Sequence, residues 1–422
     1  MKNGKKKVLL CALIFVVIAG AMYARGGREA GGRTTIRFSF DMGVGPVTQQ
    51  IVDQFNRSQN EIFVETVILP QDANIVRNNF VNILASGDTS VDVMALDVVF
   101  IAEFAAAGWL QDLGPYFDRA RIDEFLPGTI AGATFQDRLW AFPWFTNSSV
   151  LFYRKDVLAE IGADVPTTYA GWKALADRAR GVGGVQYLAS FQAAQSEALV
   201  TNWVEFIWNN GGEILNAAGE PVINSPNNIA ATYIMLDMVR NFAPAGVTTY
   251  REPESEVIFL EGRSLFIRAW SGFWARANRE GSRVAGNVGT TVLPIGPNGT
   301  SSHSCLGGLS LVVNRHISPT QRAAAIKFLH HMTAFETLKE FTLISGQPPV
   351  LRAVYRDPDV IRQIPFYAYF YNIIADARPR PVSPQYARLS DAIQRNIHQA
   401  LTGTISVESA LNNLQNEALA LR

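Results

Sequence analysis

The sequence contains very little cysteine: Cys11 and Cys305 are the only two among 422 residues. Cys11 lies inside an apolar run near the N-terminus, so removal of that run would leave Cys305 alone, and one mature chain could then form no internal disulfide. We therefore expect packing of an apolar core to stabilise the fold. A chain of this length is too long for one ordinary core, which predicts two lobes or domains.

Net charge is also absent, since 37 basic residues balance 37 acidic ones. This balance gives no basic footprint for nucleic acid, and a neutral ligand fits it at least as well as a charged one. The five histidines are scattered except for His330 and His331, which point in different directions if they lie on a helix. The sequence has no zinc-ligand spacing, nucleophile elbow, P-loop or dinucleotide motif, so we expect no metal and no cofactor.

The N-terminus has the pattern of an export signal. Basic residues at 2–7 precede an apolar run at 8–23, and the small residue Ala24 is followed by polar residues. We expect residues 1–24 to be a signal peptide and 25–33 a glycine-rich tether, which predicts a periplasmic or other extracytoplasmic location. An uncleaved N-terminal membrane anchor is the alternative.

Strands and helices alternate at the start of the mature chain. Strands are predicted at 35–40, 62–69 and 91–97, with amphipathic helices between them. This alternation indicates a parallel sheet whose ligands bind beyond the carboxyl ends of the strands. Asp97 lies at such an end, although capping of the next helix explains it equally well.

The segment from Leu139 to Asp156 places aromatic residues around the polar centre Thr146–Ser149. A buried, unpaired asparagine is costly, so Asn147 is either satisfied inside a core strand or offered to a ligand. Farther along, the pair Gly307–Gly308 allows either close approach to a ligand or a positive backbone angle. Prolines on both sides of Arg380 fix the backbone there and give its guanidinium a defined direction.

The aromatic crossing followed by Tyr153-Arg154-Lys155-Asp156 and a helix resembles the first interlobe crossover of the sugar-binding receptors of ABC importers, the extracellular solute-binding protein family 1. The pattern Asp97-Val98, Phe104 and Gly108-Trp109-Leu110 is similar to the same family, as is the stop Asn210-Gly211-Gly212. The resemblance covers nearly all of the mature chain and is closest to the trehalose/maltose-binding branch.

This resemblance implies two doubly wound α/β lobes of the periplasmic-binding-protein (Venus flytrap) type, with a ligand cleft between them that closes by hinge rotation. The expected N-terminal lobe comprises 34–143 and 287–331, and the C-terminal lobe comprises 147–283 and 335–422. The chain would cross between the lobes near 143–149, 285–291 and 332–335. The implied partners are a sugar and the transmembrane subunits of a permease with a cytoplasmic ATPase, and the protein is expected to be a monomer.

The resemblance also implies a ligand site. Trp270 would stack on the apolar face of a sugar, while polar groups reach its hydroxyls. Trp270 or Trp274 as plain core, Glu197 as a solvated helix start and Arg380 in a surface salt bridge are the structural alternatives. The expected ligand-binding residues are Asp41, Asp97, Phe145, Asn147, Gln192, Glu197, Trp270, Gly307, Gly308 and Arg380.

The sequence departs from its relatives at three places in this site. Leu309 stands where relatives of the trehalose/maltose branch have Trp, Asn147 stands where many have Asp, and the loop after Asp41 is shorter. We therefore predict a neutral di- or oligosaccharide, α-glucosides first, with another carbohydrate or a glycerol-phosphate compound as the alternative. Asp97 and Glu197 could also be the carboxylate pair of a secreted glycosidase, which the resemblance disfavours. A sensory or adhesive sugar-binding protein is not separated from a transport receptor by the sequence.

Overall fold

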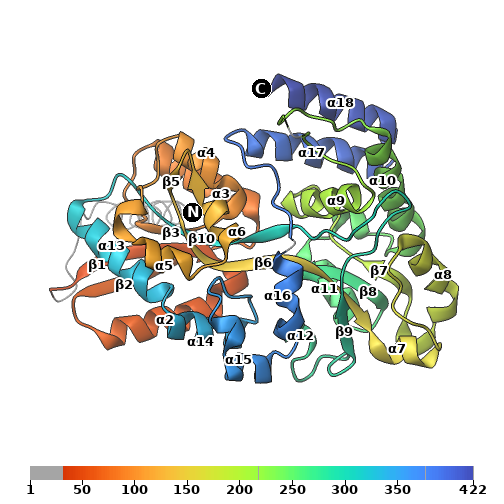
Figure 1. Cartoon of the computed structure of the whole chain (residues 1–422), viewed down its shortest axis with the longest axis horizontal. Helices are drawn as coiled ribbons and strands as arrows, with labels where there is room; N and C mark the ends of the chain where they lie inside the picture. The colour runs from red at the N-terminus through yellow and green to blue at the C-terminus, as the bar shows by residue number, and fades with distance from the viewer. Residues whose placement is uncertain (1–31, 217, 376, 422) are drawn as a thin grey trace, which may run out of the picture.

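The computed structural model describes residues 32–216, 218–375 and 377–421. Two α/β lobes lie next to each other in Figure 1, and the long strand β6 (Phe142–Arg154) runs between them. The expected signal peptide 1–24 and most of the tether 25–33 lie outside the described residues. Among the described helices, none combines the length and the apolar composition needed to cross a membrane.

The strands of both lobes form one hydrogen-bonded path in the order β2-β1-β3-β10-β6-β8-β7, and β9 also pairs with β6. β1 is parallel to β2 and β3, while β10 is antiparallel to both β3 and β6. The parallel strands confirm the predicted strand-helix alternation of the first lobe. The remaining strands are β1 (Thr34–Asp41), β2 (Ile62–Leu69), β3 (Val93–Asp97), β7 (Tyr187–Ser190), β8 (Ser264–Trp270), β9 (Val288–Thr291) and β10 (Leu306–Val313), with a small hairpin of β4 (Thr134–Phe135) and β5 (Arg138–Leu139).

Helices cover the sheet of each lobe (Figure 1). The helices of the first lobe are α2 (Gly45–Ser58), α3 (Ala73–Ala85), α4 (Ile101–Ala106), α5 (Arg119–Asp123), α6 (Pro127–Ala133), α13 (Pro319–Met332) and α14 (Phe335–Ser345). Those of the second are α7 (Lys155–Glu160), α8 (Tyr169–Ala179), α9 (Glu197–Asn209), α10 (Pro226–Asp237), α11 (Glu252–Leu260), α12 (Phe273–Ala277), α17 (Tyr386–Leu401) and α18 (Val407–Ala420). α15 (Pro358–Gln363) and α16 (Tyr367–Ala375) lie along the lower edge of Figure 1, next to both lobes.

Strand β6 changes partner in the middle. Its residues 142–148 pair with β10 of the first lobe, and its residues 149–153 pair with β8 of the second. This change of partner lies within the crossover expected at 143–149. One continuous strand therefore carries the backbone from one lobe into the other.

The other expected lobe boundaries differ from the observed pairing. β9 pairs with the second-lobe end of β6, at residues 151–154, where the strand can accept a further neighbour besides β8. α14 packs against α2 instead of the second lobe: Gln54 Nε2 donates to Glu340 Oε1 at 2.8 Å, and Phe341 lies 4.9 Å from the Trp144 ring. We therefore propose that the chain returns to the first lobe only at β10 and stays there through α14.

The aromatic crossing segment is divided between core and cleft. Trp144 is fully buried and packs edge-on against Phe38, with ring centroids 5.8 Å apart. Asn147, three residues later, is only partly buried. Alternate residues of a strand face opposite sides. The same strand therefore contributes to the core through Trp144 and faces the cleft at Asn147.

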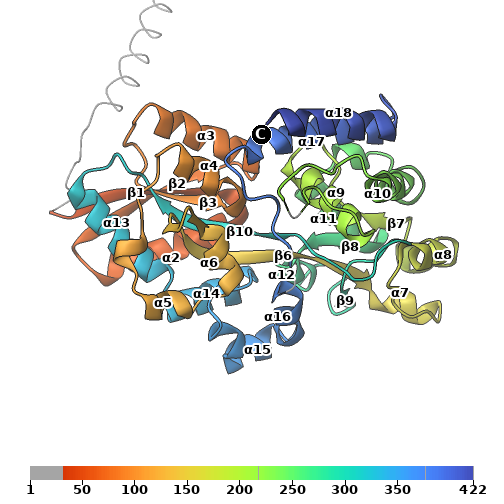
Figure 2. The same cartoon turned by 45° about the horizontal axis from the view of Figure 1, so that its top comes forward.

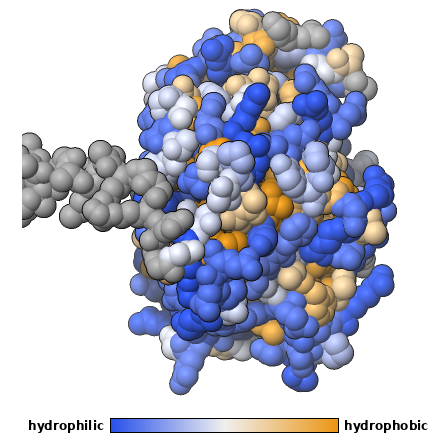
Figure 3. Space-filling view, turned by 90° about the vertical axis from the view of Figure 1, so that its left-hand side faces the viewer, coloured by the Kyte–Doolittle hydropathy of each residue, from blue (hydrophilic) through white to orange (hydrophobic). Residues whose placement is uncertain are grey.

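The two lobes touch on the side of the C-terminal helices. In Figures 1 and 2, α17 lies beside α3 and α4 across the gap between the lobes. Asn74 Nδ2 of α3 donates to Gln394 Oε1 of α17 at 3.2 Å, so the structure is a closed form. The end of the first lobe shown in Figure 3 is mostly hydrophilic, with apolar side chains in small groups between polar ones.

Gly308 provides a test of the β10–β6 contact. Its φ is +128°, and an added Cβ would lie 2.4 Å from the carbonyl oxygen of Phe145. We expect Gly308→Ala to lower the free energy of unfolding by about 2 kcal/mol or more, because a positive φ alone costs roughly 1–2 kcal/mol and the methyl group also overlaps the backbone. Urea unfolding measures this loss. Gly132→Ala in α6 is the matched control, since an added Cβ there meets nothing within 4 Å, and comparable losses in both variants would contradict the prediction.

Candidate functional site

A cavity of about 170 Å³ lies between the two lobes and is lined by residues of both. Every expected binding residue except Gln192 lines it. The first lobe and β6 contribute Asp41, Asp97, Phe145, Asn147, Gly307 and Gly308, and the second contributes Glu197, Trp270 and Arg380. Residues that are far apart in the sequence are thus brought together at one site.

Asp41 and Asp97 enter the cavity from the carboxyl ends of the parallel strands β1 and β3. Each carboxylate also caps a short 3₁₀ turn: Asp41 Oδ1 accepts from Gly43 N at 2.7 Å, and Asp97 Oδ1 accepts from Val99 N at 3.1 Å. Capping and cavity lining were alternatives for Asp97 in the sequence. The structure shows both at once, since a carboxylate oxygen can accept more than one hydrogen bond.

Arg380 joins the two lobes across the cavity. Its Nη1 lies 2.5 Å from Glu197 Oε1 of α9, and its Nη2 lies 3.4 Å from Asp97 Oδ1 of the first lobe. Tyr386 and Ser390 of α17 also donate hydrogen bonds to Glu197. Arg380 is 3% exposed and Glu197 is 5% exposed. Arg380 is therefore not in a surface salt bridge, and Glu197 does not lie at a solvated helix start.

Burial raises the pKa of Glu197, although Arg380 and the hydroxyls of Ser390 and Tyr386 favour the charged carboxylate. The same balance holds for Glu256 of α11, where burial raises the pKa and Arg276 opposes the rise. In both cases the paired arginine repays part of the desolvation cost. Glu197 and Glu256 are therefore buried carboxylates that are each held by an arginine.

Trp270 forms an aromatic wall of the cavity at the end of β8. Its indole is partly buried, its Nε1 lies 3.5 Å from Glu252 Oε1, and a Cβ added to Gly307 would lie 3.0 Å from the ring atom Cζ3. Trp274 instead packs parallel to Phe366, with ring centroids 6.2 Å apart. Of the two neighbouring tryptophans, one thus faces the cavity and the other packs in the core.

Asn147 and the glycine pair meet at the change of partner in β6. Asn147 is in register with Gly307, and its Oδ1 accepts from Ser271 Oγ at 3.0 Å. Gly308 has the positive φ that was one of the two alternatives for this pair. Both glycines also allow close approach, but to Trp270 and the Phe145 backbone of the same chain.

Gln192 does not line the cavity, so the geometry gives no support to its expected binding role. It is fully buried, donates to Ser255 Oγ at 2.6 Å and accepts from Asn202 Nδ2 at 3.0 Å. Gln192 follows β7 by two residues, and its side chain lies in the interior of the second lobe. Its amide satisfies buried polar neighbours and is not offered to a ligand.

Several charged residues of the cavity were not expected from the sequence. Arginine lines the cavity at positions 77, 251 and 276, in addition to the expected Arg380, and each guanidinium has a carboxylate partner. The partners of the first three are Glu103, Asp72 and Glu256, respectively. Arg251 is the N-cap of α11 and Glu252 is its first residue, directly after the segment 243–250. The start of a helix after this segment is the one sequence feature that could have pointed to these two residues.

Asp41 is the cavity carboxylate with the clearest electrostatic perturbation. Burial raises the pKa of Asp41 to about 6, the Gly43 N–H opposes the rise, and the negative charges of Asp97 and Glu252 add to it. No arginine or lysine forms an ion pair with Asp41 or Glu252 within the described part of the chain. The cavity thus holds more acidic than basic groups.

The raised pKa of Asp41 predicts a pH-dependent stability. The native protein binds this proton more tightly than the unfolded chain, whose aspartates titrate near 4, so this group lowers stability as the pH rises from about 4 to about 6. Asp41→Asn keeps an acceptor for Gly43 N and does not titrate. We expect the variant to be more stable than the parent by roughly 1 kcal/mol at about pH 7.5 and equal to it near pH 4, as measured by urea unfolding. A stability difference that does not change with pH would contradict the raised pKa of Asp41. The pKa of Asp92 is also raised, but Asp92 is present in both proteins, so its effect cancels in the difference.

Comparisons with known proteins address the family. The model of the family described as bacterial extracellular solute-binding protein matches residues 42–336. The solved structure of maltose-bound MalE3 of T. maritima is 34% identical, covers 92% of this chain and 100% of its own, and superposes with a TM-score of 0.89. An ABC transporter solute-binding protein of Agrobacterium radiobacter in complex with ribitol shares the fold at 22% identity, with a TM-score of 0.85 over 92% of this chain and 98% of its own.

A curated relative agrees with these matches. The probable ABC transporter-binding protein of Deinococcus radiodurans is 28% identical over 370 residues, which are 85% of this chain and 86% of that protein. The expected family and the two-lobed α/β fold are confirmed. With the family model spanning residues 42–336 and a relative of 34% identity matching over its whole length, this chain belongs to the bacterial extracellular solute-binding proteins, which bind solutes and are not enzymes.

Proposed function

We propose that this protein is the extracytoplasmic receptor of an ABC sugar importer. It captures a neutral di- or oligosaccharide, with a maltose- or trehalose-like α-glucoside favoured, and delivers it to a membrane permease. The observation that carries the proposal is the interlobe cavity, where the Trp270 indole stands among carboxylates and amides from both lobes. A sugar ring presents an apolar C–H face and polar hydroxyls, which match this arrangement.

The charge pairing in the cavity supports a neutral ligand. Arg77, Arg251, Arg276 and Arg380 each have a carboxylate partner, so binding a phosphate would require breaking an existing ion pair. Asp41 and Glu252 would also repel an anion. Hydroxyl groups, by contrast, can donate to these carboxylates without displacing a charge. A glycerol-phosphate compound, the alternative ligand, is therefore disfavoured.

The maltose in the T. maritima MalE3 structure supports an α-glucoside, since that protein is 34% identical to this chain. Leu309 lines the cavity between Asp97 and Phe145, with which it is in register. It contributes an aliphatic side chain where the related branch would place an aromatic ring. The aromatic surface for stacking then comes from Trp270 and Phe145.

Lobe closure is the proposed mechanism of capture. Contacts that exist only when the lobes are together include Arg251 with Asp72, Asn74 with Gln394, and Arg380 with Asp97. A ligand that touches both lobes adds to these contacts in the closed form alone and shifts the population toward it. The closed monomer would then dock on the transmembrane subunits of the permease, which a cytoplasmic ATPase drives, after export directed by residues 1–24.

A ligand screen with a Trp270 variant tests the proposal. Residues 25–422 are heated with maltose, trehalose, mannitol, ribitol or glycerol 3-phosphate. A ligand at about 100 times its Kd should add about 2.7 kcal/mol of stability, which appears as a higher Tm. We expect a disaccharide to raise the Tm of the parent and Trp270→Ala to lose the rise, whereas Trp274→Phe, which changes only a core contact, should keep it.

Other results of this screen would change the assignment. A rise with mannitol or ribitol alone would replace the disaccharide with a polyol. A rise with glycerol 3-phosphate would contradict the argument from the paired arginines. If Trp270→Ala kept a full response to the active sugar, the indole would not be part of the site.

The closure contacts give a further prediction. Asp72 pairs with Arg251 across the cleft and also caps α3 by accepting from Ile75 N at 2.9 Å. Asp72→Asn keeps the cap and removes the ion pair. The Arg251 side chain of the pair is 43% exposed. Because ion pairs exposed to water contribute about 0.2–1 kcal/mol, we expect a two- to fivefold weaker sugar affinity with little change in the Tm of the ligand-free protein. Calorimetric titration measures the affinity, and an unchanged Kd would remove this pair from the closure mechanism.

A further inference from the structure

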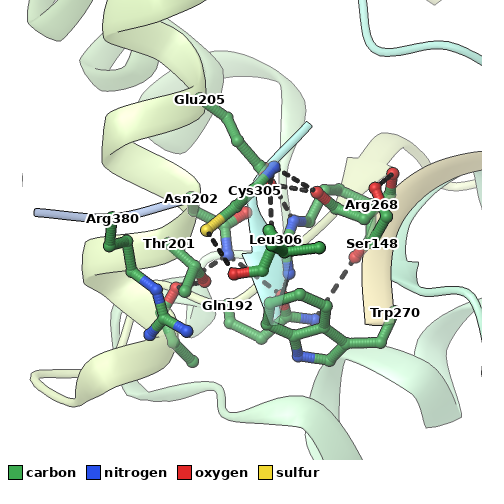
Figure 4. A network of polar contacts seen from close by, with 12 residues as sticks. Ser148, Gln192, Thr201, Asn202, Glu205, Arg268, Trp270, Cys305, Leu306 and Arg380 are labelled. Atoms are coloured by element: carbon green, nitrogen blue, oxygen red, sulfur yellow. Dashed lines mark hydrogen bonds and ion pairs between the residues drawn. The ribbon is translucent and has the colours of Figure 1, made fainter. Parts of the chain in front are cut away.

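A buried ion pair lies behind the cavity in the second lobe (Figure 4). Arg268 of β8 and Glu205 of α9 are joined by two parallel hydrogen bonds of 2.8 Å, from Nε to Oε2 and from Nη2 to Oε1. Arg268 is 6% exposed and Glu205 is 2% exposed. Neither residue lines the cavity, so a direct contact with the ligand does not account for the pair.

Arg268 supports the Trp270 indole from the protein interior. Its guanidinium carbon lies 4.6 Å from the centroid of the Trp270 ring, two residues along the same strand. A guanidinium packed on an aromatic face attracts it electrostatically, and the attraction is stronger where water is excluded. The remaining Nη1 of Arg268 donates to Gln192 Oε1 at 3.2 Å, which fixes the plane of the guanidinium.

Glu205 connects this support to the chain crossings between the lobes. Its Oε1 also accepts from the Ser149 hydroxyl of β6 and from Cys305 N at 3.0 Å, immediately before β10 begins. Ser149 is in register with Trp270 and is the first residue of β6 that pairs with β8. One carboxylate therefore contacts β6 and the residue before β10, where the chain makes two of its passages between the lobes.

The energetics argue that the pair has a role beyond stability. Removing two charges from water is expensive, and apolar residues of similar volume often stabilise a core equally well or better. The pair is nevertheless fully hydrogen-bonded in a fixed geometry, because the planar fork of arginine matches a carboxylate. Such an arrangement defines the position of whatever is packed on it.

We propose that Arg268 and Glu205 are positioning residues for Trp270, holding the indole at the cavity and tying its place to the interlobe crossings at Ser149 and Cys305. The expected effect of the pair on sugar affinity rests on the proposed function. Its expected effect on the position of the Trp270 indole does not depend on that function.

The experiment compares two double variants that each remove the ion pair of a buried arginine without leaving an unpaired charge; Glu205 is buried as well, whereas the side chain of Asp156 is 35% exposed. Glu205→Gln with Arg268→Met removes the pair behind Trp270. Arg154→Met with Asp156→Asn is the matched control, because Arg154 is also a buried arginine of the second lobe, 2.5 Å from Asp156, and does not line the cavity. Each is measured for Tm, for maltose affinity by calorimetry, and for the emission of Trp270, taken as the difference from the same protein with Trp270→Phe.

We expect the Arg268 variant to bind maltose about tenfold more weakly and to expose Trp270 to acrylamide quenching, while the control loses only Tm. In a Trp270→Ala background, removal of the pair should cause no further loss of affinity. Arg268→Lys retains a positive charge beside Glu205, so its affinity and its protection from quenching should lie between those of the parent and those of the double variant. If the double variant does not fold, Arg268→Lys is compared with the parent in its place.

Two results separate the possible failures. If Trp270 emission and maltose affinity match those of the control, the pair is only structural and the inference is wrong. If the parent binds no sugar, the proposed function fails, and Trp270 quenching alone decides the positioning role: altered quenching supports it and unchanged quenching overturns it.

Discussion

The rest of the structure depends on β6 being a single continuous strand shared by two lobes. Its first half is hydrogen-bonded to β10 and its second half to β8, so the residues at the change of partner have fixed places relative to both lobes. Asn147 and Ser149 lie at this point. Gly307 of β10 is paired with Asn147, and Trp270 of β8 is paired with Ser149, so this one register sets the polar and aromatic parts of the cavity side by side.

The positive charges of the cavity are balanced locally. Each cavity arginine has its own carboxylate, and Arg380 has one from each lobe. Such pairs contribute little net stability once desolvation is counted, but they fix the direction of every donor and acceptor before a ligand arrives. Affinity then comes from aromatic contact and from hydroxyl hydrogen bonds to groups that need no rearrangement. A site that is preorganised in this way loses little conformational entropy on binding.

The sequence predicted the parts of the site that follow from local rules. β2 has the expected bounds of 62 to 69. Asp97 was singled out by its place at the carboxyl end of a parallel strand together with the family resemblance, and Asp41 by the resemblance alone. Gln192 lies outside the cavity, because its side chain is held by Asn202, Ser255 and Arg268 inside the second lobe. Arg251, just before α11, and Arg276, within α12, were missed because the local sequence does not show which way their side chains point. The short strand β9 was expected in the N-terminal lobe but pairs with the second-lobe end of β6, a choice that depends on strands distant in the chain.

The threading of the chain through both lobes has a consequence for biosynthesis. The sheet of the first lobe is completed by β10 and its helical cover by α13 and α14, while the second lobe needs α17 and α18. Neither lobe can therefore finish folding as it emerges from the ribosome, because each waits for a segment that is synthesised after part of the other lobe. Contacts of such long sequence separation form slowly. A chain with this topology therefore remains incompletely folded until its last helices have been synthesised. Passage through a narrow export channel requires such an unfolded chain.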